Sequence, residues 1–293
     1  MKRETSERIL PFAMRPRPTI TLIGPGNLGS GMAVALQSAG YRLLEIVYRG
    51  APARARALAR RVHARAVTLA NAELAADVLW LCVGDSAIAS TAVQLARRTN
   101  WKGKVVLHAS GALSSSLLAP LRARGAAIAS LHPMMSFVRG VTPDLRGVTF
   151  ALEGDARALR LARGIARDLG GRVISIAPRR KPLYHALGAF ASPLLVALLA
   201  AGERVADAAG IPRDDARRAL APILQQTLRN YLAHGPAGAF SGPMVRGDIA
   251  IIRRHLHVLK AVPEARAAYI ALARVSLALL PTKKKKALAS LLK

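Results

Sequence analysis

Short apolar runs alternate with longer helical patterns between Thr19 and Ala177. The runs predict β-strands at residues 19–23, 43–48, 78–83, 105–108, 127–131, 149–152 and 173–176. This alternation is typical of a mostly parallel, doubly wound sheet with helices on both faces. After Pro178, long apolar helical periods dominate as far as Leu280, with breaks at residues 210–212, 235–243 and 263. The pattern therefore predicts an α/β domain followed by an all-α domain.

The first apolar run ends in a Gly-x-Gly-x-x-Gly motif, and a helical pattern follows at once. Gly24 suits the tight turn from strand to helix, Gly26 lets a pyrophosphate approach the backbone, and Gly29 allows close packing of helix on sheet. The amides at the start of this helix, which include Asn27 and Leu28, would face the phosphates. The motif predicts a dinucleotide site, and the alternative is a glycine turn that binds nothing.

The end of the second run indicates which dinucleotide is bound. A carboxylate there would bind the ribose 2′-hydroxyl of NAD, whereas an arginine would accept the 2′-phosphate of NADP. From Arg49 to Arg65 the chain holds several arginines and no Asp or Glu. Glu45 lies three strand residues earlier and should point away from the ribose. Arg49 and Arg54 are therefore the predicted phosphate contacts and NADP the predicted cofactor, while the other arginines suit a solvated helix face.

Composition and charge narrow the class of protein. Hydrophobic residues make up 52% of the chain and aromatic residues only 4%, so Ala, Leu, Val and Ile must build the core. The net charge of +28 raises the question of nucleic acid. The arginines are spread through nearly every predicted helix, however, with few aromatic residues beside them. We therefore expect no specific nucleic-acid partner, nonspecific polyanion binding remains open, and the charge should attract anionic cofactors and carboxylate substrates.

The N-terminus, the most apolar segment and the single cysteine indicate the cellular compartment of the protein. Residues 1–17 carry charges of both signs without an apolar centre, so neither a signal peptide nor an anchor is expected. Ala186 to Gly202 contains Pro193 and is short for a membrane span, which favours a buried helix. Cys82 is the only cysteine and is interpreted as an inert core thiol. These features predict a cytoplasmic protein with no membrane contact.

The domain prediction follows from the same patterns. Residues 18–178 form the nucleotide-binding domain, and residues 179–281 form the helical domain for substrate and dimer contacts. Residues 1–17 and 282–293 are predicted to be loose basic termini.

Polar residues follow the carboxyl ends of several predicted strands, where open α/β sheets bind ligands. Gly84 and Asp85 follow one strand and are candidates for cofactor contact, although Asp85 or its neighbour suits a helix cap equally well. His108 and Ser110 follow the next, where a nicotinamide ring would lie, and a buried structural histidine is the alternative. His132 begins a loop with two methionines that could close over a small ligand, although methionines more often belong to the core.

Lys181 and His185 lie one helical turn apart at the start of the helical region, so their side chains should share a face. A desolvated lysine can donate a proton to a developing alkoxide or amine, and a histidine one turn on can tune its pKa or be the acid itself. An ordinary exposed helix start is the alternative. Arg246 could receive a substrate carboxylate in bidentate fashion, and Asp248 suits a helix N-cap.

Together these segments resemble a family of Rossmann-like NADP oxidoreductases with a C-terminal helical domain of unknown function. The matching blocks are residues 24–29, 108–112, 132–137, 181–186, 241–243, 246–248 and 255–256. The family is similar to ketopantoate reductase, pyrroline-5-carboxylate reductase and the β-hydroxyacid dehydrogenases, which hold nicotinamide between a Rossmann domain and a helical domain. The resemblance implies a catalytic role for Lys181 and a homodimer. Ser192 stands where we expect asparagine, and its hydroxyl can still bind substrate.

The leading hypothesis is NADPH-dependent reduction of a small carboxylate-bearing ketone or imine, with a 2-keto acid of the ketopantoate type as first candidate. Lys181, aided by His185, would supply the proton. Ser110, His132, Ser192 and Arg246 would contact substrate. The alternative is a non-catalytic NADP-binding regulator, against which the absence of a DNA-reading motif weighs. No metal site is predicted, because His255-x-His257 places its two rings on different helix faces.

Overall fold

The strands of the N-terminal unit bury side chains on both of their faces. In β4 (Val78–Leu81), Val78 and Trp80 belong to one core cluster, whereas Leu79 and Leu81 belong to another. Alternate residues of a strand point to opposite faces, so two clusters mean that both sides of the sheet are covered. This explains why the runs read as continuously apolar in the sequence.

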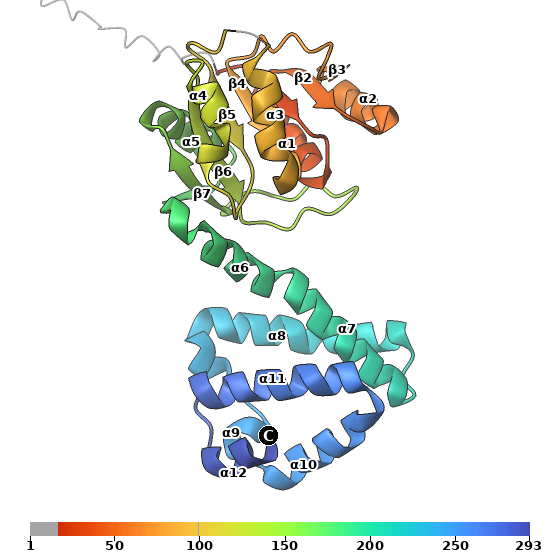
Figure 1. Ribbon diagram of the computed structural model, residues 1–293. Coiled ribbons are helices and arrows are strands. Elements are labelled where there is room, and N and C mark those ends of the chain that lie inside the picture. Colours follow the sequence, from red (N-terminus) through yellow and green to blue (C-terminus); the bar gives the residue numbers. More distant parts are fainter. Residues whose placement is uncertain (1–16, 99) are drawn as a thin grey trace, which may run out of the picture. The chain divides into compact units, whose positions relative to one another are not determined.

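The computed structural model describes residues 17–98 and 100–293, in which eight strands form one sheet (Figure 1). Their order is β3-β2-β1-β4-β5-β6-β7-β8, and all neighbours are parallel except β6 and β7. The other strands are β1 (Ile20–Ile23), β2 (Leu43–Tyr48), β3 (Arg65–Thr68), β5 (Val105–His108), β6 (Ala127–Pro133), β7 (Thr149–Gly154) and β8 (Arg172–Ser175). The predicted doubly wound, mostly parallel sheet is confirmed.

Two details of the strand prediction are wrong. β3 was missed because only two apolar residues lie between Arg65 and Thr68, too few for a visible pattern, and the strand forms by pairing with β2 at the sheet edge. β6 continues through His132, which was predicted to lie in a loop, because its residues pair antiparallel with β7.

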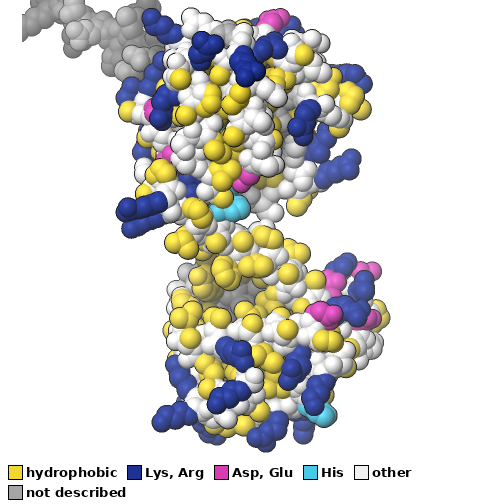
Figure 2. All heavy atoms as spheres, in the orientation of Figure 1, with side chains coloured by type: hydrophobic (Ala, Val, Ile, Leu, Met, Phe, Trp, Pro, Cys, Tyr) yellow, Lys and Arg dark blue, Asp and Glu magenta, His cyan; other side chains and the backbone are white. Residues whose placement is uncertain are grey.

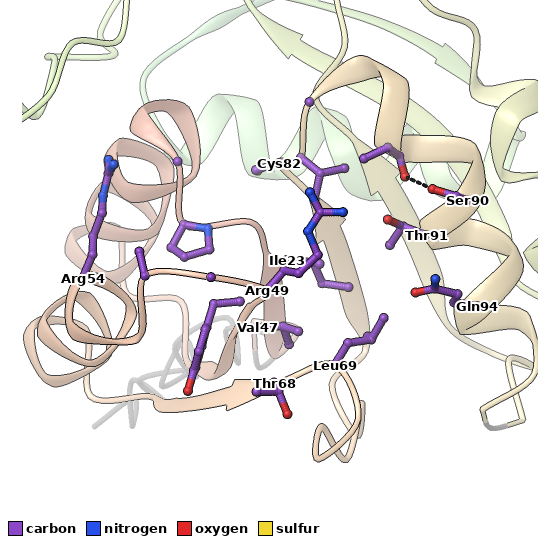
Figure 3. Close-up of a pocket in the computed structure, with 18 residues that line it drawn as sticks. Ile23, Val47, Arg49, Arg54, Thr68, Leu69, Cys82, Ser90, Thr91 and Gln94 are labelled. Atoms are coloured by element: carbon purple, nitrogen blue, oxygen red, sulfur yellow. Dashed lines mark hydrogen bonds between the residues drawn. The ribbon is translucent and has the colours of Figure 1, made fainter.

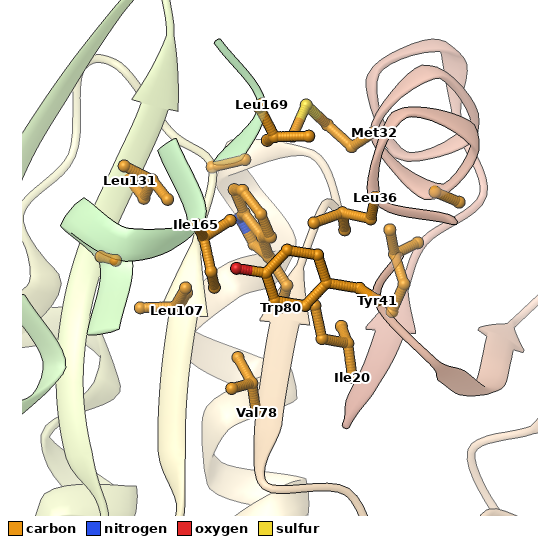
Figure 4. Packing of buried hydrophobic residues seen from close by; sticks show 14 of the residues in the cluster. Ile20, Met32, Leu36, Tyr41, Val78, Trp80, Leu107, Leu131, Ile165 and Leu169 are labelled. Carbon is orange, nitrogen blue, oxygen red and sulfur yellow. The ribbon is translucent and has the colours of Figure 1, made fainter. Parts of the chain in front are cut away.

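Helices cover both faces of the sheet. α1 (Asn27–Ser38), α2 (Pro52–Arg61) and α5 (Ala156–Asp168) contribute to the cluster around Trp80, while α3 (Asp85–Ala96) and α4 (Ala119–Arg122) pack into the cluster on the opposite face. Trp80 is fully buried beside Tyr41, Met32 and Ile165 (Figure 4). These contacts hold the strands in place, and the candidate site lies at the carboxyl ends of the strands.

The rest of the chain is helical, and the contact pattern divides the molecule between Gly188 and Ala189, inside α6 (Lys181–Ala191). The second unit contains α7 (Pro193–Ala208), α8 (Arg213–Ala239), α9 (Pro243–Arg246), α10 (Ile249–Val258), α11 (Pro263–Leu279) and α12 (Lys285–Leu291). The predicted breaks agree with these bounds, since α8 is interrupted at Gly235, where φ is +68°. The predicted all-α region is confirmed.

The C-terminus differs from its prediction as a loose basic tail. Residues 285–291 form α12, and Leu288 and Leu292 are buried in a core cluster of the helical unit. Leucines four residues apart lie on one helix face. Their burial favours an ordered helix despite the run of lysines at its start. At the other end, Arg17 forms an ion pair with Asp168 at 3.3 Å. The rest of the predicted leader, residues 1–16, lies outside the described residues.

The segment from Ala186 to Gly202 is helical but is not the buried helix that its composition predicts. Leu194 is 51% exposed and Val196 is 63% exposed. The helical run Pro178–Ala208 is long and apolar enough to cross a membrane by length and composition alone. Figure 2 shows hydrophobic side chains on the surface over α6 and α7. The segment from Ala186 to Gly202 carries no charged side chain, and in its α7 part the packing neighbours α8 and α11 leave Leu194 and Val196 exposed.

Candidate functional site

A pocket of about 540 Å³ lies at the carboxyl ends of β1, β2 and β4. Pro25 and Gly26 of the glycine loop form part of its wall. The sheet order reverses between β1 and β4, and such switch points are where doubly wound sheets bind ligands. The position is therefore the one expected for a dinucleotide.

The three glycines of the loop occupy three different environments. Gly24 has φ of +98°, and a Cβ there would lie 2.7 Å from the carbonyl oxygen of Cys82. A Cβ on Gly29 would lie 2.1 Å from the carbonyl oxygen of Gly24. A Cβ on Gly26 would meet no atom within 4 Å, so this residue presents bare backbone to open space. This is the geometry that the motif predicts for turn, close packing and phosphate approach.

Helix α1 begins beside this open space, with Gly26 at its N-cap and no side chain capping its amides. The first amides of a helix lack partners within the helix and carry partial positive charge. Asn27 and Leu28 open the helix, so an anion against Gly26 would meet their backbone N–H groups. The residues present therefore fit a pyrophosphate.

Arg49 and Arg54 both line the pocket on the β2–α2 side (Figure 3). The guanidinium of Arg54 donates a hydrogen bond of 3.0 Å to Oδ1 of Asn27, which ties α2 to the start of α1. Among the described residues that line this pocket there is no Asp or Glu. The site is thus suited to a phosphate on the adenosine ribose.

Glu45, the competing carboxylate, is turned away as predicted. It is only 1% exposed and accepts hydrogen bonds from Arg65 and from the backbone amides of Glu73 and Leu74. These donors occupy the carboxylate inside the unit. Glu45 therefore cannot compete with Arg49 for the ribose.

The opposite wall of the pocket corrects two sequence interpretations. Cys82 lines the pocket instead of lying wholly in the core, although burial raises the pKa of its thiol and keeps it unreactive. Gly84 occupies the N-cap position of α3, and no side chain caps the helix. Capping by Asp85 or Ser86 was wrong because these are already the first two residues of the helix. Gly84 lines the pocket, and Asp85 does not.

A second group of polar residues surrounds Lys181, which is fully buried. Its Nζ donates to the carbonyl oxygen of Ser110 at 3.0 Å and to Oγ of Ser130 at 2.6 Å, and lies 3.9 Å from Oε1 of Glu153. Burial lowers the pKa of Lys181, and the negative charge of Glu153 opposes this effect. The lysine therefore ties the first turn of α6 to the loop after β5, to β6 and to β7.

Glu153 is itself held in place. Its carboxylate accepts hydrogen bonds from the backbone amide and the hydroxyl of Ser115, both at 2.7 Å. The Ser110 hydroxyl accepts from the amides of Ala112 and Leu113, so it shapes the loop after β5. Glu153 and the loop at Ser110, which both contact Lys181, are thus themselves held in place by hydrogen bonds within the chain.

His185 lies outside this network. It is exposed, and its ring centroid is 6.0 Å from that of His132. Tyr184, which the sequence reasoning missed, is 7% exposed, and its hydroxyl lies 2.9 Å from Nδ1 of His132. Its spacing of three residues from Lys181 was the available signal. A Cβ on Gly111 would lie within 3 Å of both imidazole rings, so glycine is needed for their approach.

Two histidines of this group are held neutral. His108 is fully buried, and its Nδ1 accepts from the amide of Ser110 at 3.1 Å. Burial and then the charge of Lys181 lower the pKa of His108 to about 4. Burial, followed by the neighbouring His185, lowers the pKa of His132 to about 4 as well. The alternative of a buried structural histidine therefore fits His108.

Two predicted substrate residues belong to the second unit. Ser192 is the residue before α7 and is partly buried. Arg246 ends α9, and its Nε donates to Oδ2 of Asp248 at 2.9 Å. Asp248 occupies the N-cap position of α10 as predicted, but its carboxylate binds Arg246 and caps no amide. In the described part of the chain, no group of three or more His, Cys, Asp or Glu side chains could hold a metal ion.

The glycine loop, the switch-point pocket and the sheet order together define a Rossmann-type dinucleotide fold. Residues 6–133 match the model of a Rossmann-like domain, and residues 148–275 match the model of a domain of unknown function, DUF2520. The chain thus combines a Rossmann-like domain with a DUF2520 domain, and the resemblance stated from the sequence is confirmed. Comparison with functionally curated proteins gives no match.

Solved structures cover nearly the same length of chain. A putative NADP oxidoreductase from Bacteroides fragilis has a TM-score of 0.77 at 23% identity and covers 88% of this chain and 97% of its own. A protein from Thermotoga maritima has a TM-score of 0.73 at 25% identity, with 87% and 97% covered. A reductive aminase from Aspergillus terreus, in complex with NADPH and ethyl-5-oxohexanoate, has a TM-score of 0.63 at 16% identity, with 95% and 100% covered. These similarities support the fold.

Proposed function

We propose that this protein is an NADPH-dependent reductase of a small ketone or imine. The observation that carries the proposal is the pocket at the sheet switch point, which is lined by bare backbone at Gly26, by Arg49 and by Arg54, with no Asp or Glu among its described lining residues. The designation of one similar structure as an NADP oxidoreductase, and the NADPH bound in another, support the choice of cofactor.

NADPH would supply a hydride to the carbon of the C=O or C=N bond. The chain must then place a proton on the oxygen or nitrogen that gains the electron pair. The predicted proton-donating residues, Lys181 and His185, lie on α6 beside the carboxyl ends of β5 and β6. We retain both as candidates for this step and Asp85 as a candidate near the cofactor.

The substrate class is a carboxylate-bearing ketone or imine, with a ketopantoate-type 2-keto acid as the first candidate. Ser110 and His132 in the first unit, and Ser192 and Arg246 in the second, are the proposed substrate contacts. Because Arg246 already binds Asp248, a substrate carboxylate would have to compete with or share this partner. Substituting Arg246 by Ala should chiefly raise KM, and an unchanged KM would assign the arginine to structure.

The experiment is a screen for NADPH oxidation, followed by absorbance at 340 nm. Ketopantoate, 1-pyrroline-5-carboxylate and a ketone offered together with a primary amine would represent the three substrate types. Gly26→Ala is the matched control, since it should need at least tenfold more NADPH for the same oxidation rate while keeping the fold. NADPH binding without turnover of any probe would instead favour the non-catalytic regulator, and no NADPH binding would overturn both.

We also propose that the protein is a cytoplasmic homodimer in which a second copy covers α7. Leu194 and Val196 are more than half exposed on an apolar helix, and water-facing surfaces of this kind mark interfaces. A membrane is disfavoured as the alternative because Lys181 and Tyr184, at the start of the same helical run, are buried against the sheet. Light scattering of the purified chain tests this, with Val196→Glu expected to give monomers and exposed Lys260→Glu as control. A monomeric wild type would refute it.

A further inference from the structure

The hydrogen bonds around α6 distinguish Lys181 from His185 as a possible proton donor. Lys181 has no exposed surface, and its ammonium already donates to Ser110 and Ser130 beside Glu153. A group that protonates a substrate must touch the atom that receives the proton. Lys181 would have to break both bonds and leave Glu153 buried without its partner before it could do so.

His185 has the access that Lys181 lacks. It is exposed one turn further along α6, and its ring meets that of His132 at an interplanar angle of 74°. Gly111 lies against both rings, and the strand ends of β5 and β6 carry this group at the edge where the sheet binds ligands. His185 can therefore exchange protons with water while facing the same edge of the sheet.

The tautomer of His132 is coupled to its hydrogen bond with Tyr184. Burial raises the pKa of Tyr184 to about 12, so its hydroxyl is protonated, and its partner among the described residues is Nδ1 of His132. If the hydroxyl donates, Nδ1 accepts, and neutral His132 must carry its proton on Nε2. Nε2 is the atom that lies against Gly111, beside His185. In this tautomer, His132 presents an N–H donor beside the exposed His185.

The charges around this group come from several elements. Lys181 on α6 and His108 at the end of β5 act on His132, whereas Asp85, which opens α3, and Glu153 in β7 act on Lys181. Burial first, and then the charges of His185 and Lys181, lower the pKa of His132 to about 4, so neutral His132 is suited to donate a hydrogen bond and not to act as the acid. His185 is the member of the pair that is exposed.

We propose that His185 donates the proton, that Tyr184 positions His132 so that its Nε2–H binds the acceptor atom, and that Lys181 holds α6 on the sheet. The proposal rests on the proposed reductase function. As hydride reaches the carbon, the C=O or C=N π electrons move to oxygen or nitrogen. The N–H bond of the His185 imidazolium breaks, a new O–H or N–H bond forms, and neutral His185 recovers a proton from water.

The positioning role is tested first, without turnover. Nitrogen-15 NMR of the histidine rings in the full chain should show His132 neutral with its proton on Nε2 from pH 6 to 8. Tyr184→Phe should remove this fixed tautomer and yield a mixture, whereas His257→Gln, which changes an exposed histidine of the other unit, should not. A proton on Nδ1 of His132 in the wild type would overturn the assignment.

The donor role is tested with a substrate found in the screen. His185→Gln should lower kcat about 10²- to 10⁴-fold and abolish the pH dependence of kcat, with an unchanged dissociation constant for NADPH. His257→Gln should leave all three unchanged. Wild-type kcat in His185→Gln would refute the donor role. If the wild type turns over no probe, the proposed function itself is refuted, while the NMR result still decides the tautomer.

Discussion

Gly26 and Gly29 lie three residues apart in one loop, yet a methyl group added to each should have different effects. At Gly29 it should lower the stability of the fold, and at Gly26 it should weaken NADPH binding. A Cβ on Gly29 would lie 2.1 Å from a backbone oxygen and 3.1 Å from side-chain atoms of Cys82 and Leu22. Overpacking against backbone costs about 3 kcal/mol, and the better helix propensity of alanine offsets about 1 kcal/mol. Gly29→Ala should therefore lose about 2 kcal/mol of folding free energy.

Gly26→Ala should leave the fold almost unchanged. Its φ of −68° suits alanine, and no atom lies within 4 Å of the new methyl group. The poorer N-cap costs up to about 1 kcal/mol, and the stiffer unfolded chain returns about the same amount. The methyl group would instead occupy the space proposed for the pyrophosphate. NADPH affinity should fall at least tenfold, which is about 1.4 kcal/mol.

Urea unfolding of both variants and fluorescence titration with NADPH would measure the two effects separately. The wild-type chain provides the reference for each. The reasoning fails if Gly26→Ala binds NADPH as tightly as the wild type. It also fails if the two variants are equally destabilised, because the loop would then respond to any side chain.

Three further predictions concern charge. Arg49→Ala should weaken NADPH binding about tenfold, as loss of a charge-assisted hydrogen bond does, and leave NADH binding unchanged; equal losses in the two titrations would contradict a 2′-phosphate contact. Lys181→Met should destabilise the chain by about 3–5 kcal/mol, because it leaves buried Glu153 without its cationic partner, and adding Glu153→Gln should recover part of this in urea unfolding. No recovery would mean that the ion pair is unimportant. The lowered pKa of His108 favours the neutral ring in the folded state, so its contribution of about 3 kcal/mol is complete above pH 6.5 and disappears as the pH falls to about 4. Unfolding measured at pH 7.5 and 4.5 should show this loss in the wild type and a smaller one in His108→Gln.

The sheet and its glycine loop were predictable because their signals are local. The apolar runs recur in order, and the turn at Gly24 follows its strand directly. β3 escaped notice because it is a short edge strand stabilised by pairing with β2. The exposure of α7 was equally hidden, because an apolar helix reads the same whether its own chain or a second molecule covers it.

The details around α6 could not be read from the sequence, because they depend on distant contacts. His132 and Tyr184 are 52 residues apart, and Lys181 and Ser130 are 51 apart. Spacing along the helix suggested that Lys181 and His185 act together. The fold instead places Lys181 in a buried network and His185 against His132. This happens because β6 extends as far as Pro133 and so places His132 at the carboxyl end of the strand.

This arrangement changes how a variant of Lys181 must be interpreted. Loss of turnover in Lys181→Ala is expected if the lysine donates the proton. It is also expected if the lysine only holds α6 in place, because Tyr184 and His185 would then lose their alignment with His132. The two roles predict different changes in the free energy of unfolding. A proton donor at the surface can be removed at little cost to folding, whereas removal of the buried partner of Glu153 destabilises the fold. A turnover defect that follows the loss of folding free energy across Lys181 variants, together with a defect in a fully stable His185→Gln, would assign anchoring to the lysine and proton transfer to the histidine.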